Sequence, residues 1–149
     1  MSRAVPFLAV YAGLMLAATG WTAEQPTYTP ESGLALSGYD PIAYFTDGQP
    51  VEGRAEFGYQ WQGATWQFNS LEHLERFKAD PAAFAPAFGG YCAWAVSQGY
   101  TASADPLAWR IVAGRPYLNY RLEVQQTWAR DVPGNIARGE ANWPGVLDR

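Results

Sequence analysis

The stretch that decides the fold is EFGYQWQGATWQF, residues 56–68. Aromatic residues stand at every second position on either side of the pair Gln62-Gly63, which can turn the chain. A period of two is typical of a β-strand with one buried face. The alternating aromatic positions are Phe57, Tyr59, Trp61, Trp66 and Phe68. We therefore predict a β-hairpin with an aromatic face, and we expect Trp66 to be buried.

A helix is predicted directly after this hairpin. Ser70 is a favoured N-cap residue, and Leu71, Leu74 and Phe77 follow at helical spacing. The pattern predicts a helix from Ser70 to about Ala79, with the three apolar side chains facing the core.

A second hairpin and two further helices are predicted in the second half of the chain. A second hairpin is predicted at Trp109–Val112 and Pro116–Asn119, joined by the turn Ala113-Gly114. Helices are expected from about Arg121 to Arg130 and around Ile136–Ala141. No sequence repeat is evident.

Three Asp-Pro pairs mark further helix starts, because Asp is a good N-cap and Pro suits the first helical position. They are Asp40-Pro41, Asp80-Pro81 and Asp105-Pro106. Short strands and helices are thus interleaved along the chain. The expected fold class is α+β, a small single domain of two short β-hairpins with short helices packed on them.

The N-terminus has the pattern of a signal peptide or short anchor, residues 1–23. Arg3 gives a positive start, Val5–Ala18 is apolar, and small residues follow up to Gly20. The apolar run is shorter than the ~20 residues of a membrane span. Cleavage after Gly20 or Ala23 is expected, which predicts an exported, periplasmic protein with no membrane span after cleavage.

The rest of the chain has the composition of a folded domain. It is divided into an extended lead-in, residues 24–36, and one domain, residues 37–149. The whole chain is 48% hydrophobic and 15% aromatic, with a formal net charge of −4. Because Lys and Arg are not clustered, binding to nucleic acid or to an anionic membrane is not expected.

Several segments resemble YHS-domain proteins. WQFNSLEHLERFKADPAAF, residues 66–84, is similar to the core of that domain. SGYDPIAYF (37–45), GGYCAWA (89–95), YLNY (117–120) and ANWP (141–144) resemble the exported, stand-alone YHS-domain proteins of bacteria. The resemblance spans residues 37–149.

The resemblance implies a link to metal trafficking. In the YHS domains of heavy-metal P-type ATPases, the first turn of the helix often carries a Cys ligand, with a Cys-Gly-Met segment upstream. This chain has His73 at that position and lacks Cys-Gly-Met. Some stand-alone members carry selenocysteine at the position that matches Cys92.

The candidate metal ligands are Cys92, His73 and Asp40. Cys92 and His73 are the only Cys and His of the chain. A thiolate and a neutral imidazole suffice for Cu(I), and Asp40 can complete a Cu(II) site. A structural zinc site needs four ligands and is not expected. The leading hypothesis is an exported copper-binding protein that interacts with a metal-trafficking or thiol partner protein. No catalytic residue is expected.

Two alternatives stay open. Cys92 alone can act in thiol-redox chemistry. Otherwise Cys92 is a buried apolar side chain, His73 flanks the helix stripe, Asp40 is a helix cap, and the domain serves protein interaction. For the shared metal site, we expect the Gly89-Gly90 bend to bring Cys92 to the first turn of the Ser70–Ala79 helix.

Overall fold

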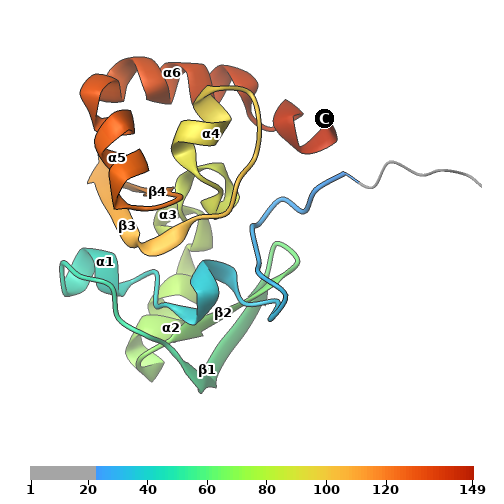
Figure 1. Cartoon of the computed structure of the whole chain (residues 1–149). Coiled ribbons are helices and arrows are strands. Elements are labelled where there is room, and N and C mark those ends of the chain that lie inside the picture. The colour runs from blue at the N-terminus through green and yellow to red at the C-terminus, as the bar shows by residue number, and fades with distance from the viewer. Residues whose placement is uncertain (1–22) are drawn as a thin grey trace, which may run out of the picture.

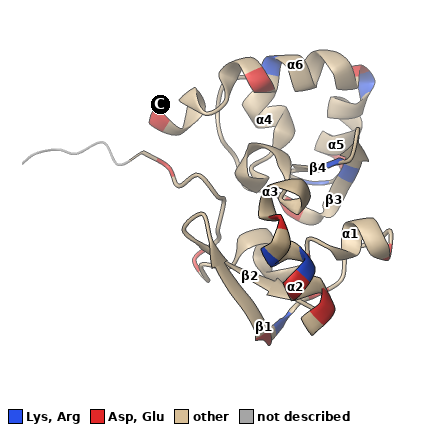
Figure 2. Cartoon of the chain, turned by 180° about the vertical axis from the view of Figure 1, so that it is seen from behind, with Lys and Arg blue, Asp and Glu red and all other residues tan. Residues whose placement is uncertain are grey.

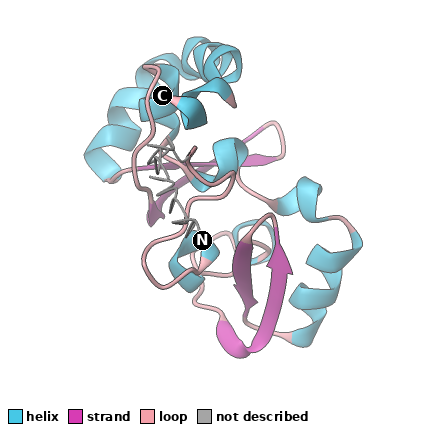
Figure 3. Cartoon of the chain, turned by 90° about the vertical axis from the view of Figure 1, so that its right-hand side faces the viewer, coloured by secondary structure: helices cyan, strands magenta, loops and turns pink. Residues whose placement is uncertain are grey.

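Two β-hairpins organise the fold in the computed structural model, which describes residues 23–149 (Figures 1 and 3). Each hairpin is a separate two-stranded antiparallel sheet, and short helices surround both. The strands are β1 Arg54–Trp61, β2 Ala64–Phe68, β3 Asp105–Val112 and β4 Arg115–Asn119. The α-helices are α1 Ala43–Thr46, α2 Leu71–Ala79, α3 Pro81–Phe84, α4 Ala93–Ser97, α5 Leu122–Trp128 and α6 Val132–Asn142. The 3-10 helices are η1 Ala35–Gly38, η2 Ala87–Gly90, η3 Ala129–Asp131 and η4 Gly145–Asp148. The predicted α+β fold of two hairpins with short helices is confirmed.

The N-terminal segment is tied to the second half of the chain. The Glu24 N–H donates to the Leu147 carbonyl at 2.8 Å, and the Tyr28 N–H donates to the Gly89 carbonyl at 2.9 Å. The predicted signal peptide falls on residues 1–22, which lie outside the described residues, and on Ala23. Within residues 23–149, no helix combines the length and apolar character needed to cross a membrane.

The two hairpins are structural copies of each other. Adding 51 to the bounds of β1 and β2 gives the bounds of β3 and β4. Both turns use two residues with positive φ, 52° and 72° at Gln62-Gly63 and 50° and 78° at Ala113-Gly114. Both ladders shift register after their first pair. The helices that follow, α2 and α5, also begin 51 residues apart.

The copy extends upstream to the 3-10 helices. In η1 the left-handed residues are Leu36 and Ser37, and in η2 they are Phe88 and Gly89, 52 positions later. We call residues 35–79 the first unit and residues 87–128 the second unit. In Figure 1 the first unit lies below the second, with α3 between them. The repeat escapes sequence comparison because few equivalent positions carry the same residue.

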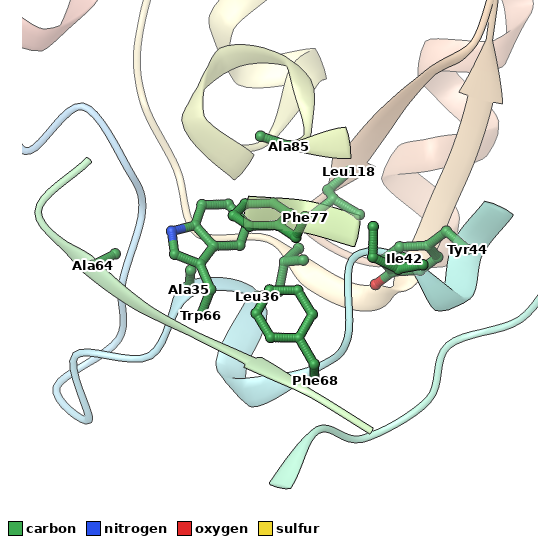
Figure 4. Packing of buried hydrophobic residues seen from close by; sticks show 10 residues of the cluster. All are labelled: Ala35, Leu36, Ile42, Tyr44, Ala64, Trp66, Phe68, Phe77, Ala85 and Leu118. Carbon is green, nitrogen blue, oxygen red and sulfur yellow. The ribbon is translucent and has the colours of Figure 1, made fainter. Parts of the chain in front are cut away.

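Each unit has its own hydrophobic core, and an aromatic pair at equivalent positions lies in both cores. Trp66 and Phe77 lie 5.1 Å apart between ring centroids, with an interplanar angle of 32°. The equivalent rings of Tyr117 and Trp128 lie 5.4 Å apart at 30°. Leu118 of the second unit packs into the first core, as Figure 4 shows, so the units share apolar surface. The predicted burial of Trp66 is confirmed, with 1% of its surface exposed.

Two local predictions are wrong. Asp105-Pro106 starts β3 and no helix, because Asp105 pairs with Asn119 and Pro106 lies in the irregular stretch where the ladder does not need its missing N–H. Leu71 is 57% exposed. A helix turns by about 100° per residue, so residues three apart drift by about 60° per step, and Leu71 points away from the face of buried Phe77.

Candidate functional site

Asp40 is a fully buried carboxylate held by backbone N–H groups. Its Oδ1 accepts hydrogen bonds from Ile42 N at 2.8 Å and Ala43 N at 3.4 Å. Its Oδ2 accepts one from Asn69 N at 2.9 Å and lies 2.5 Å from His73 Nδ1. The N-cap residue of α1 is Ile42, so Asp40 lies two residues before the predicted cap position, and its carboxylate contacts both the backbone at the start of α1 and the His73 imidazole.

His73 lies in the first turn of α2, where its backbone N–H donates to the N-cap hydroxyl of Ser70 at 3.2 Å. Its side chain is 14% exposed. Nε2 lies 3.4 Å from the Thr46 hydroxyl. A proton on Nδ1, shared with Asp40, leaves the electron pair of Nε2 facing the Thr46 hydroxyl.

Cys92 is buried and occupies the N-cap position of α4, where its side chain makes no capping hydrogen bond. Its Sγ accepts a hydrogen bond from Tyr120 N at 3.3 Å, and the thiol donates to Asn119 Oδ1 at 3.6 Å. Burial raises the pKa of the thiol, while backbone N–H groups of Ala95, Tyr120 and Trp94 act in the opposite direction. The sulfur is thus desolvated, but nearby backbone N–H groups favour its thiolate.

Asp40 and Cys92 occupy equivalent places in the two units, 52 positions apart. The Asp40 N–H donates to the Val51 carbonyl at 2.8 Å, and the Cys92 N–H donates to the Ala102 carbonyl at 3.0 Å. Each side chain accepts an N–H from the residue that directly follows the second strand of its own unit. The thiol therefore stands in a backbone cradle that holds a carboxylate in the first unit.

The structure brings together two of the three expected metal ligands. Asp40 and His73 are in contact in the first unit, whereas Cys92 belongs to the second. Cys92 faces the start of α5, where Val124 is the equivalent of His73, and does not face α2 as expected. Among residues 23–149, no three Cys, His, Asp or Glu side chains are grouped to hold a metal ion.

A pocket of about 280 Å³ is lined in part by Cys92. Its lining carries no charged side chain, and Figure 2 shows no charged residue on α4. Two tyrosines of the lining, Tyr100 and Tyr120, are about half exposed. The lining residues are Cys92, Trp94, Ala95, Tyr100, Ala102, Tyr120 and Val124. The thiol thus borders an uncharged cavity whose rim reaches solvent.

Asn119 is the site residue that the sequence did not indicate. It is fully buried at the end of β4, and its Oδ1 accepts from Trp94 N at 3.0 Å as well as from the Cys92 thiol. Its Nδ2 is buried without a hydrogen-bond partner. Phe68 holds the equivalent position in the first unit. Asn119 therefore stands out as a site residue only once the two units are aligned, as a polar residue at a position that is apolar in the first unit.

A second pocket, of about 250 Å³, is lined by Gln62 of the first hairpin turn and by Arg115 at the start of β4, among others. Three tryptophans line it, and two of them, Trp61 and Trp66, belong to the aromatic face predicted for the first hairpin. Its aromatic lining residues are Trp61, Trp66 and Trp143, and its larger polar ones are Gln62 and Arg115. Since Trp66 is almost fully buried in the core, its ring serves mainly packing.

Comparisons with known proteins give no identification. No protein-family model, no curated protein and no solved structure shows significant similarity to this chain.

Proposed function

We propose that the protein acts through the thiol of Cys92, which exchanges with small, uncharged disulfides. The thiolate attacks one sulfur of a disulfide R–S–S–R and forms a mixed disulfide with Cys92. The leaving thiolate R–S⁻ takes up the proton that Cys92 lost. A second thiol reverses the step and regenerates Cys92, so sulfur and protons balance.

One observation carries the proposal: the Cys92 sulfur accepts the Tyr120 N–H with further backbone N–H donors near it, and Cys92 lies at the edge of a pocket. The donors favour the thiolate, which is the nucleophile. The pocket gives a reagent room beside the sulfur. Because burial raises the thiol pKa, the exchange is slow at neutral pH and accelerates as the pH rises.

Intact-mass measurement after incubation with matched disulfides tests the proposal. The probes are bis(2-hydroxyethyl) disulfide, which is neutral, and cystamine, which is cationic. Relative to their rates with N-acetylcysteine, the neutral probe should react at least about tenfold faster, because a charge must be desolvated to enter the pocket. Cys92→Ser should gain no adduct. Absence of an adduct on the wild type would refute the proposal.

A pair of alanine variants tests the route through the pocket. Ala102→Leu fills space beside the sulfur and should slow the exchange with the neutral disulfide. Ala55→Leu, at an exposed position of β1, is the matched control and should react like the wild type. Equal rates for both variants would mean that reagents reach Cys92 by another path.

Copper binding is the second proposal, and one observation favours it. His73 has Nδ1 against the Asp40 carboxylate, and metal-binding histidines commonly give their second ring nitrogen to a carboxylate in this way. We propose that copper binds at His73 Nε2, with Asp40 orienting the ring, and that Cys92 would bind Cu(I) separately.

Copper titration against a competing chelator tests this second proposal. Because the two residues belong to different units, His73→Ala and Cys92→Ser should each remove a separate part of the bound copper. A shared site predicts the opposite result, in which either substitution alone abolishes binding. Wild-type protein that binds no copper would refute both versions.

Export to the periplasm also remains a proposal. It is supported by the positive residue, short apolar run and small residues within 1–23. The mass of the mature protein tests it. A start between about residues 19 and 24 is expected for a cleaved signal peptide, and a mass that includes residue 1 would refute cleavage.

A further inference from the structure

The equivalence of Asp40 and Cys92 has a chemical consequence. An aspartate side chain is a CH₂ group that carries a two-oxygen anion. Oxidation of cysteine to the sulfinate gives a CH₂ group that carries SO₂⁻, which is also a two-oxygen anion. The cradle of the first unit holds such a group with backbone N–H donors to both oxygens. The cradle of the second unit has the same backbone frame.

The second unit also holds a buried donor with nothing to bind. Asn119 Nδ2 is fully buried and unpartnered, on the same amide whose Oδ1 lies 3.6 Å from Cys92 Sγ. Leaving a buried donor unpaired is costly, and the reduced thiol supplies no acceptor for Nδ2, because it is Oδ1 of the same amide that faces the sulfur. An oxygen atom on the sulfur becomes such an acceptor once the Asn119 amide turns to present Nδ2 in place of Oδ1.

We infer that Cys92 is a modification site, at which peroxides oxidise the thiol to a sulfinate that the cradle and Asn119 then stabilise. The thiol and a peroxide R–OOH give Cys92–SOH and R–OH. The sulfenic acid and a second peroxide give Cys92–SO₂H and another R–OH, and the acid proton leaves to solvent. Each step moves two electrons from sulfur to the peroxide O–O bond.

The inference shares with the proposed function only the need for access to the sulfur through the pocket. One difference between the units makes an anion harder to stabilise at Cys92 than at Asp40. In the first unit His73 faces the carboxylate, whereas Val124 stands at that position in the second. The sulfinate would therefore depend on neutral donors alone, the backbone N–H groups and Asn119 Nδ2. A substitution that mimics the anion measures whether they suffice.

The first experiment exposes the full-length chain to hydrogen peroxide or cumene hydroperoxide. The peptide that contains Cys92 should gain about 32 Da, resistant to dithiothreitol, as expected for a sulfinate. Mapping to this peptide is needed because Met1 and Met15 also take up oxygen. The oxidised protein should unfold at a temperature no lower than the reduced protein. No gain at Cys92, progression to sulfonate, or a lowered midpoint overturns the inference.

The second experiment uses Cys92→Asp as a permanent mimic and Cys92→Asn as its neutral, matched control. A cradle for an anion predicts that the Asp variant melts at or above the Asn variant at pH 7. It also predicts that this advantage disappears as the pH falls and the carboxylate is protonated. An Asp variant that melts more than about 4 °C below the Asn variant overturns the inference.

The two proposals at Cys92 fail in different ways. Mixed disulfide formation without a sulfinate removes this inference and leaves the exchange function. A sulfinate without mixed disulfide formation supports this inference and removes the exchange function. No reaction with either reagent removes both.

Discussion

Replacing Asp40 with alanine tests the structural equivalence most directly. The carboxylate is fully buried and accepts N–H groups at 2.8 and 2.9 Å, with His73 Nδ1 beside it. Hydrogen bonds to a charged group contribute about 1.5–3 kcal/mol each, and removing one partner of a buried pair costs about 3–5 kcal/mol. Asp40→Ala should therefore lower the free energy of unfolding by at least about 4 kcal/mol, and Asp40→Asn by less.

Cys92→Ala removes a side chain from the equivalent place in the second unit. The sulfur accepts one N–H, from Tyr120 at 3.3 Å, and sulfur is a weak acceptor. The expected loss is about 1–2 kcal/mol. Asp40→Ala should therefore lower the free energy of unfolding by at least about 2 kcal/mol more than Cys92→Ala does.

Urea unfolding followed by tryptophan fluorescence and circular dichroism measures both losses. Glu52→Ala, at an exposed position, is the control and should stay within about 0.5 kcal/mol of the wild type. A loss below about 1 kcal/mol for Asp40→Ala, or a loss no larger than that for Cys92→Ala, would refute the reasoning.

Three other predictions concern packing and titration. Trp66→Ala should cost about 3–5 kcal/mol because the ring is buried in the first core, and an unchanged urea midpoint would contradict this. Gly89→Ala should greatly lower the melting temperature, because a Cβ there would lie 1.9 Å from the Pro26 carbonyl oxygen. Gly48→Ala, also at positive φ but in open space, is the control and should lower it far less; equal decreases would mean that the positive φ alone causes the destabilisation. Burial raises the pKa of the Cys92 thiol, so the unfolded chain loses this proton first and the free energy of unfolding should decrease as pH rises above about 8.5. Cys92→Ser should lack the contribution of the thiol to this decrease, and identical pH profiles of unfolding for the two proteins would contradict the raised thiol pKa.

The sequence alone determined the elements that depend on local patterns. The first hairpin follows from alternating aromatic residues around Gln62-Gly63, and the second from the turn pair Ala113-Gly114 between two predicted strands; both turns have positive φ. The start of α2 follows from Ser70, whose side chain does cap it. These features were predictable because neighbouring residues supply both the pattern and the interaction that fixes it.

Tertiary structure decided the site. Asp40 and His73 are 33 residues apart and meet only because both point to the junction after β2. Cys92 meets Asn119 and Tyr120 at the corresponding junction of the second unit. No local pattern distinguishes the two junctions, so the sequence could not tell which of them Cys92 would join. The equivalence of a carboxylate and a thiol was hidden for the same reason, because the backbone frame repeats while the side chains it holds differ.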